Sequence, residues 1–108
     1  MYELFEGQSF ELRKVSPRVL KFFKQDLEID FVDNKKLSDF SFNITIGAGD
    51  DKNQEILVKV INALFKRADG KEVTKEEIET LELDLALFTK GFQDFFFRLA
   101  SPMGNFLS

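Results

Sequence analysis

The sequence LELDLALFTKGFQDFFFRL, residues 81–99, decides the fold. Its apolar residues recur at spacings of three and four, as they do along one face of an α-helix. The recurring positions are Leu81, Leu85, Phe88, Phe92, Phe95 or Phe96, and Leu99. We therefore expect a closing amphipathic helix whose apolar face is buried against the rest of the chain.

Two features of this helix indicate that it packs on more than one side. Phe95, Phe96 and Phe97 are consecutive, and at about 100° per residue they span about 200°, so at least one ring points away from the main apolar face. Gly91 lies in mid-helix, where glycine costs about 1 kcal/mol relative to alanine but permits a close approach by another backbone. The second side is covered either by another element of this chain, such as an N-terminal hairpin, or by a partner protein.

The N-terminal residues predict a β-hairpin followed by a helix. Residues 2–15 alternate apolar and polar side chains on both sides of Glu6-Gly7-Gln8, which favours two short strands joined by a turn. Ser16 is a good N-cap, and Pro17 fits the first turn of a helix that continues to about Leu27.

The middle of the chain predicts one further strand and a long helix. Residues 39–46 alternate Phe and Ile with polar residues, a period of two that favours a strand, and this strand ends at the Gly47-Ala48-Gly49 loop. A broad apolar stripe then begins near Lys52 and predicts a helix that is stopped by the Asp69-Gly70 turn.

After that turn, Thr74 and Glu77 form the T-x-x-E pattern of a capping box, which predicts another helix that ends or bends near residues 82–84. At the other end, Ser101-Pro102 is expected to stop the closing helix. Residues 1–100 are then a single globular domain and residues 101–108 a C-terminal tail. The predicted fold class is α+β and mostly helical, with an N-terminal β-hairpin, one further short strand, and three to four amphipathic helices.

The amino-acid composition excludes several common kinds of catalytic site. The chain has neither Cys nor His, so it has no thiolate nucleophile, no cysteine zinc site and no imidazole base. The segment around Asp69-Gly70 resembles half of an EF-hand calcium loop, but Phe65 and Arg67 then fall on the first and third ligand positions, where neither can bind Ca²⁺. We expect no enzyme activity, no catalytic residue, no cofactor and no metal.

The charge and hydropathy patterns also narrow the choice of partner. The net charge is −4, which disfavours general binding to nucleic acid or to an anionic membrane. No apolar run approaches the roughly 20 residues that span a bilayer, and the N-terminus lacks the pattern of a signal peptide. We therefore expect a cytoplasmic protein whose partner is another protein, and self-association into a homo-oligomer stays open.

Two parts of the chain are similar to a known family. Residues 64–105, LFKRADGKEVTKEEIETLELDLALFTKGFQDFFFRLASPMGN, resemble the C-terminal half of small bacteriophage tail assembly chaperones of the siphophage type. That family combines an amphipathic helix, a short Asp/Gly turn with the pattern vT.EeIE.L, and a closing helix with paired aromatics. The N-terminal stretch YELFEGQSFELRKVSPRVLKFF resembles the opening hairpin and helix of the family.

The resemblance implies a protein that binds the tape measure protein, and in some cases tail tube subunits, while the phage tail is built. Such a chaperone acts in the host cytoplasm and is absent from the mature virion. It would cover apolar helical segments of the tape measure protein. The residues we expect to contact the partner are Phe92, Phe96, Phe97, Phe106 and Leu107.

A second hypothesis is a small phage-encoded inhibitor or regulator that binds a host nucleic-acid enzyme through its acidic surface. It rests on the acidic stretch Glu28 to Asp51 and on the acidic cluster Glu72 to Asp84. Competition with nucleic acid for the host enzyme would favour the inhibitor, and copurification with a long coiled-coil protein would favour the chaperone.

Overall fold

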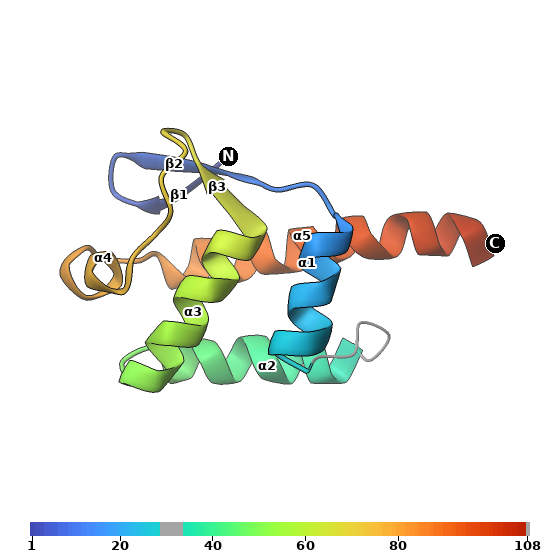
Figure 1. Ribbon diagram of the computed structural model, residues 1–108, viewed down its shortest axis with the longest axis horizontal. Helices are drawn as coiled ribbons and strands as arrows, with labels where there is room; N and C mark the ends of the chain where they lie inside the picture. The colour runs from blue at the N-terminus through green and yellow to red at the C-terminus, as the bar shows by residue number, and fades with distance from the viewer. Residues whose placement is uncertain (29–33, 108) are drawn as a thin grey trace.

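A computed structural model describes the backbone of residues 1–28 and 34–107 and the side chains of residues 1–28 and 35–99. Its elements, in chain order, are β1 (Tyr2–Phe5), β2 (Gln8–Leu12), α1 (Pro17–Lys21), the π-helical turn η1 (Phe22–Asp26), α2 (Asn34–Ile46), α3 (Asp51–Leu64), β3 (Phe65–Arg67), α4 (Lys75–Thr80) and α5 (Leu85–Leu107). The predicted α+β, mostly helical fold class is confirmed. Helix α5 runs along the long axis, with the sheet on one side of it and α2 on the other (Figure 1).

The N-terminal hairpin is confirmed and forms part of an antiparallel sheet in the order β1-β2-β3. Strand β1 pairs with β2 through Tyr2 opposite Phe10 and Phe5 opposite Gln8, and the turn between them contains Gly7 at a φ of +74°. A positive φ is costly for residues with a side chain, so glycine suits this turn. The hairpin is marginal alone, and α5 packs against β1.

The third strand lies at residues 65–67, whereas the sequence pattern placed the further strand at residues 39–46. The helix expected to continue to Asp69-Gly70 therefore ends earlier, at Leu64. Phe65 adopts an extended conformation and pairs with Leu12 of β2, and both Phe65 and Arg67 are buried. This pairing joins residues more than 50 positions apart, so the helical periodicity of residues 56–65 does not reveal it.

Residues 39–46 belong to helix α2, so the predicted strand is wrong. Leu37, Ser41 and Ile44 are buried at the spacing of a helix face. The alternation that resembled a strand divides between two faces of the helix: Ile44 is buried, whereas Phe42 and Ile46 are 64% and 66% exposed. Packing of α2 against α5 has overridden the local preference for a strand.

The predicted helix starts are confirmed. The Ser16 side chain accepts a hydrogen bond from the Val19 N–H at 3.4 Å, and α1 continues through η1 to Asp26. Thr74 and Glu77 form both bonds of the capping box at the start of α4, and that helix ends at Thr80, before α5 begins at Leu85. Each cap satisfies a backbone group that the helix itself leaves unpaired.

Arg67 connects α4 to the sheet through side-chain hydrogen bonds. Its guanidinium is buried and donates two hydrogen bonds of 2.7 Å to the Glu77 carboxylate and one of 2.9 Å to the Gln8 side chain. These bonds from Arg67 hold the pKa of the Glu77 carboxyl below its ordinary value. Because a buried guanidinium is costly without a partner, α4 and the hairpin are held together at this point.

A row of aromatic rings runs along α5 and forms the centre of the core. The centroids of Tyr2 and Phe65 are 5.6 Å apart, those of Phe65 and Phe88 6.2 Å, those of Phe88 and Phe92 6.2 Å, and those of Phe92 and Phe96 4.7 Å. These spacings are typical of favourable aromatic pairs. The buried face of residues 81–99 is therefore confirmed for Phe88, Phe92 and Phe95, while Phe97 is the ring that points elsewhere.

Helix α5 continues to Leu107, so the prediction that Ser101-Pro102 ends it is wrong. Proline removes its own N–H bond to the carbonyl four residues earlier, but the residues on both sides still form theirs, so a helix can pass through it. The last turns extend past the other elements (Figure 1). The division into a domain, 1–100, and a tail, 101–108, stays a prediction.

Gly91 allows the ring of Phe65 to lie directly against α5. A Cβ atom at position 91 would come 2.3 Å from Cζ of Phe65 and 2.5 Å from its Cε1. The Phe65 ring cannot move aside freely because it is buried and contacts Tyr2 and Phe88. The close approach expected at Gly91 is confirmed, although the approaching group is a ring rather than a backbone.

We predict that Gly91→Ala lowers the free energy of unfolding by about 1–2 kcal/mol, because overpacking at the upper end of its usual range of about 1–3 kcal/mol outweighs a gain of about 1 kcal/mol in helix propensity. Urea unfolding followed by circular dichroism measures the change. The control is Gly49→Ala, because a Cβ at Gly49 meets nothing within 4 Å. A Gly91→Ala variant as stable as the parent would contradict this account of the contact.

Tyr2 anchors the first strand to α5. Its hydroxyl donates a hydrogen bond to the Asp94 carboxylate. Burial of the ring, together with this hydrogen bond, raises the pKa of Tyr2 to about 12. The folded protein therefore holds the phenol proton more tightly than the unfolded chain, in which tyrosine ionises near pH 10.

We predict that this contribution to stability is complete below about pH 10 and is lost as the pH rises toward about 12, to a total of about 2 kcal/mol. Urea unfolding at about pH 9 and about pH 11 should show a larger loss for the parent chain than for Tyr2→Phe, which has no ionisable ring. The chain has one tyrosine, so phenolate absorbance reports this group alone. Equal losses in the two proteins would refute the assignment.

Candidate functional site

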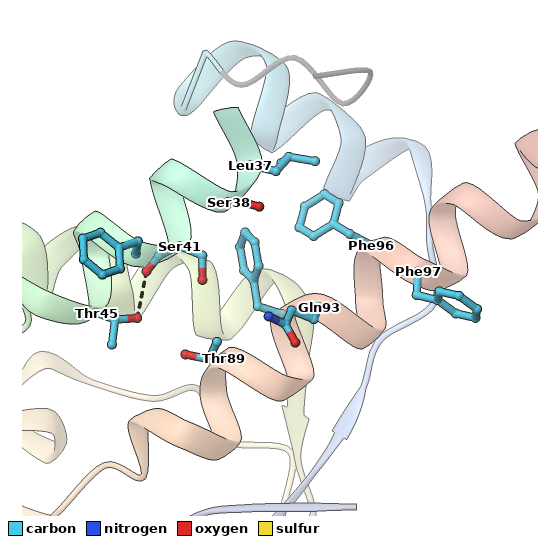
Figure 2. A pocket seen from close by; sticks show the side chains of 10 residues that line it. Leu37, Ser38, Ser41, Thr45, Thr89, Gln93, Phe96 and Phe97 are labelled. Carbon is cyan, nitrogen blue, oxygen red and sulfur yellow. Dashed lines mark hydrogen bonds between the residues drawn. The ribbon is translucent and has the colours of Figure 1, made fainter. Parts of the chain in front are cut away.

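A groove of about 560 Å³ separates α2 from α5. Its size falls in the range of ligand-binding clefts. Its lining residues are Leu37, Ser38, Ser41, Phe42 and Thr45 of α2, and Thr89, Phe92, Gln93, Phe96 and Phe97 of α5. Figure 2 shows the two helices facing each other across this space.

The two threonine hydroxyl groups in the groove bond to their own helices. Thr45 donates to the Ser41 carbonyl at 2.8 Å, and Thr89 donates to the Leu85 carbonyl at 2.9 Å. These i to i−4 bonds satisfy the hydroxyls locally. The surface that a ligand would meet then consists of methyl groups and rings, together with the side chains of Ser38, Ser41 and Gln93.

The floor of the groove is rigid. Phe92 is 3% exposed and packs on Phe88, Phe96, Phe23 and Phe40. Phe96 is half-buried and lies edge-on to Phe23, with the ring centroids 5.2 Å apart. Since each ring is held by several neighbours, the floor is preformed.

The rim carries one exposed ring from each helix. Phe42 of α2 is 64% exposed and Phe97 of α5 is 75% exposed. In Figure 2, Phe96 points from α5 toward Leu37, whereas Phe97 points away from α2. Two large exposed rings beside a single apolar hollow are typical of a surface that binds another molecule.

Over residues 1–28 and 35–99, whose side chains are described, the lining of the groove contains no ionisable side chain. The described lining therefore offers apolar contacts and uncharged hydroxyl and amide groups. Among the residues whose side chains are described, no group of three or more acidic residues is arranged to hold a metal ion. Within the described chain, no helix combines the length and apolar character needed to span a bilayer.

The structure brings together three of the five residues predicted to contact a partner. Phe92, Phe96 and Phe97 all line the groove. The side chains of Phe106 and Leu107 lie outside the described residues. Their backbone belongs to the last turn of α5, and Phe106 is about 14 Å farther along the helix axis than Phe97.

The α2 side of the groove was missed, because residues 39–46 were interpreted as a strand. A helical signal is present in the same residues: Leu37, Phe40, Ser41 and Ile44 recur at the spacing of one helix face, and Phe42 and Ile46 are four residues apart on another. The second pair indicates an apolar strip that the fold of this chain leaves uncovered.

Comparison of the chain with protein-family models, with curated proteins and with solved structures found no match.

We predict that the rim and the floor differ sharply in their effect on stability. Phe42→Ser and Phe97→Ser should each change the free energy of unfolding by no more than about 0.5 kcal/mol, because both rings are largely exposed. Phe92→Ala should cost about 3–5 kcal/mol, because it opens a cavity in the row of rings. Urea unfolding of the three variants compares them, and a large loss from either rim variant would show that its ring is part of the core.

Proposed function

We propose that the chain is a non-enzymatic phage tail assembly chaperone that binds apolar helical segments of the tape measure protein in the groove between α2 and α5. The observation that carries this proposal is the uncharged groove with an exposed phenylalanine on each side. Three of its lining residues, Phe92, Phe96 and Phe97, are among those expected from the sequence to contact a partner, and they come from the closing helix.

The length of the groove suits a helix. Its lining runs from Leu37 to Thr45 on α2 and from Thr89 to Phe97 on α5, about 12 Å on each side at 1.5 Å per residue. Two turns of a partner helix have this length and present three apolar side chains at i, i+4 and i+7. The groove therefore fits one short segment of an amphipathic helix, and a long partner would be covered by many copies of the chain.

The energy available is sufficient for a moderate affinity. Burying an exposed Phe side chain contributes about 1.5–3 kcal/mol, and Phe42 and Phe97 are both available. The floor residues are already held in place, so binding orders few additional side chains. Reversible binding of this kind suits a chaperone, which has to release the tape measure protein when tube subunits polymerise around it.

One specific observation favours the second function, inhibition of a host nucleic-acid enzyme. Glu3 and Glu6 of the hairpin line the same hollow as Glu82 and Asp84, which precede α5. These four carboxylates form an acidic surface that could imitate nucleic acid in an inhibitor of a host enzyme. Glu3 also accepts a hydrogen bond from the Gly7 N–H at 2.8 Å, so part of this acidity serves the hairpin turn. The proposal therefore rests on the groove.

The test uses peptides from amphipathic segments of the tape measure protein encoded in the same tail gene cluster. Fluorescence anisotropy should show that the double variant Phe42→Ser/Phe97→Ser binds at least about tenfold more weakly than the parent chain. Ile46→Ser is the matched control: Ile46 is as exposed as Phe42 on the same helix but does not line the groove.

Unchanged peptide binding by the double variant would remove the groove from the proposal. If the parent chain instead forms a dimer that the double variant loses, as measured by light scattering, the groove is a self-association surface and the proposed partner is wrong. Competition between the chain and nucleic acid for a host enzyme would favour the inhibitor.

A further inference from the structure

A second hollow, of about 610 Å³, lies between the segment that follows β2, helix α1 with η1, and helix α3. It is lined by four cationic side chains from separate parts of the chain: Arg13, Lys14, Arg18 and Lys59. The lining includes one carboxylate, that of Glu72. The hollow thus carries a net charge of +3 in a chain whose net charge is −4.

These four cations have no carboxylate within 4.0 Å in the part of the chain whose side chains are described. Like charges gathered around one hollow repel each other, and here no internal ion pair offsets that repulsion. An anion from outside would do so. Because the chain carries −4 and the hollow +3, the rest of the chain carries −7 and repels anions, so this hollow is the place where an anion is attracted.

The guanidinium of Arg13 is held in position. Its Nε donates to the carbonyl of Asn62 at 3.0 Å and to the carbonyl of Phe65 at 3.1 Å. Asn62 is itself fixed by two hydrogen bonds with the backbone of Val73. The terminal nitrogens of Arg13 make no hydrogen bond within the described chain, so a planar fork suited to phosphate is presented without further ordering.

Apart from Ser16 and Asn62, the uncharged part of the lining is apolar. Phe22 is half-buried and lies edge-on to Phe23 at a centroid distance of 5.4 Å, which fixes its ring. Val19, Val58, Ala63 and Val73 complete this part of the surface. A ligand that fills the hollow therefore has two parts, a compact multiply charged anion and an apolar or aromatic body.

We propose that this hollow binds a nucleoside diphosphate or a chemically similar phosphorylated small molecule. The phosphates lie against Arg13, Arg18 and Lys59, and the ring lies against Phe22. A diphosphate carries about three negative charges at neutral pH, which match the net charge of the lining. The volume is within the range of small-molecule sites. An acidic peptide spreads its carboxylates along an extended chain and fits a confined hollow less well.

Isothermal titration calorimetry with adenosine diphosphate tests the proposal, with adenosine, inorganic phosphate and a Glu-rich peptide compared at matched ionic strength. We expect adenosine diphosphate to bind at least about tenfold more tightly than each of the other three, since only it supplies both parts. Arg18→Gln and Lys59→Gln should each weaken this binding about tenfold. Lys21→Gln is the matched control, because Lys21 is an exposed cation of α1 outside the lining.

Circular dichroism establishes that the variants fold. The proposal is overturned if adenosine diphosphate does not bind, if inorganic phosphate binds equally well, or if the Glu-rich peptide binds more tightly. It is also overturned if Lys21→Gln weakens binding as much as Arg18→Gln and Lys59→Gln do, because the effect would then be general charge attraction.

Discussion

The contact between the ring of Phe65 and the bare backbone of Gly91 is the constraint on which the rest of the structure depends. Phe65 is the residue at which α3 ends and β3 begins, so its position fixes both a helix and an edge of the sheet. Its ring also contacts Tyr2 from the first strand. Because α5 can approach this ring only through a glycine, the sheet, α3 and α5 have one mutual arrangement. The position of the groove depends on this arrangement, because its floor is formed by the next turns of α5.

Local signals predicted the parts of the fold that local interactions determine. The hairpin turn at Gly7, the cap at Ser16 and the capping box of Thr74 and Glu77 each involve residues within a few positions of each other. Strand β3 depends on pairing with a strand more than 50 residues away, and α2 depends on packing against α5. Neither the pairing strand nor the packing helix can be recognised from the local sequence of β3 or α2. Pro102 was misleading for a different reason, because one lost hydrogen bond does not end a long helix.

Only the α5 side of the groove was predictable from the sequence. One ring pointing away from the main face was expected because Phe95, Phe96 and Phe97 cannot share one helix face, and that geometric argument does not depend on the rest of the fold. Phe92 and Phe96 were recognised by their spacing along the apolar face of the closing helix. Phe42 could not be identified while residues 39–46 were assigned to a strand. Arg13, Lys14 and Arg18 lie close together in the sequence, but the sequence does not connect them with a hollow. Their convergence with Lys59 required the packing of α1 against α3, which no local pattern records.

The exposed rim of α2 has a consequence for the behaviour of the chain when it is not folded. Residues 40–46, FSFNITI, contain no charge, no proline and no glycine, and they alternate bulky and polar side chains. Seven residues of this type are the signature of a segment that stacks into cross-β fibrils. In the native protein this stretch lies in helix α2, so its backbone is not extended and cannot pair with a neighbouring strand. Local melting of α2 would remove that protection, and the lifetime of a concentrated solution would then be set by how often this one helix opens.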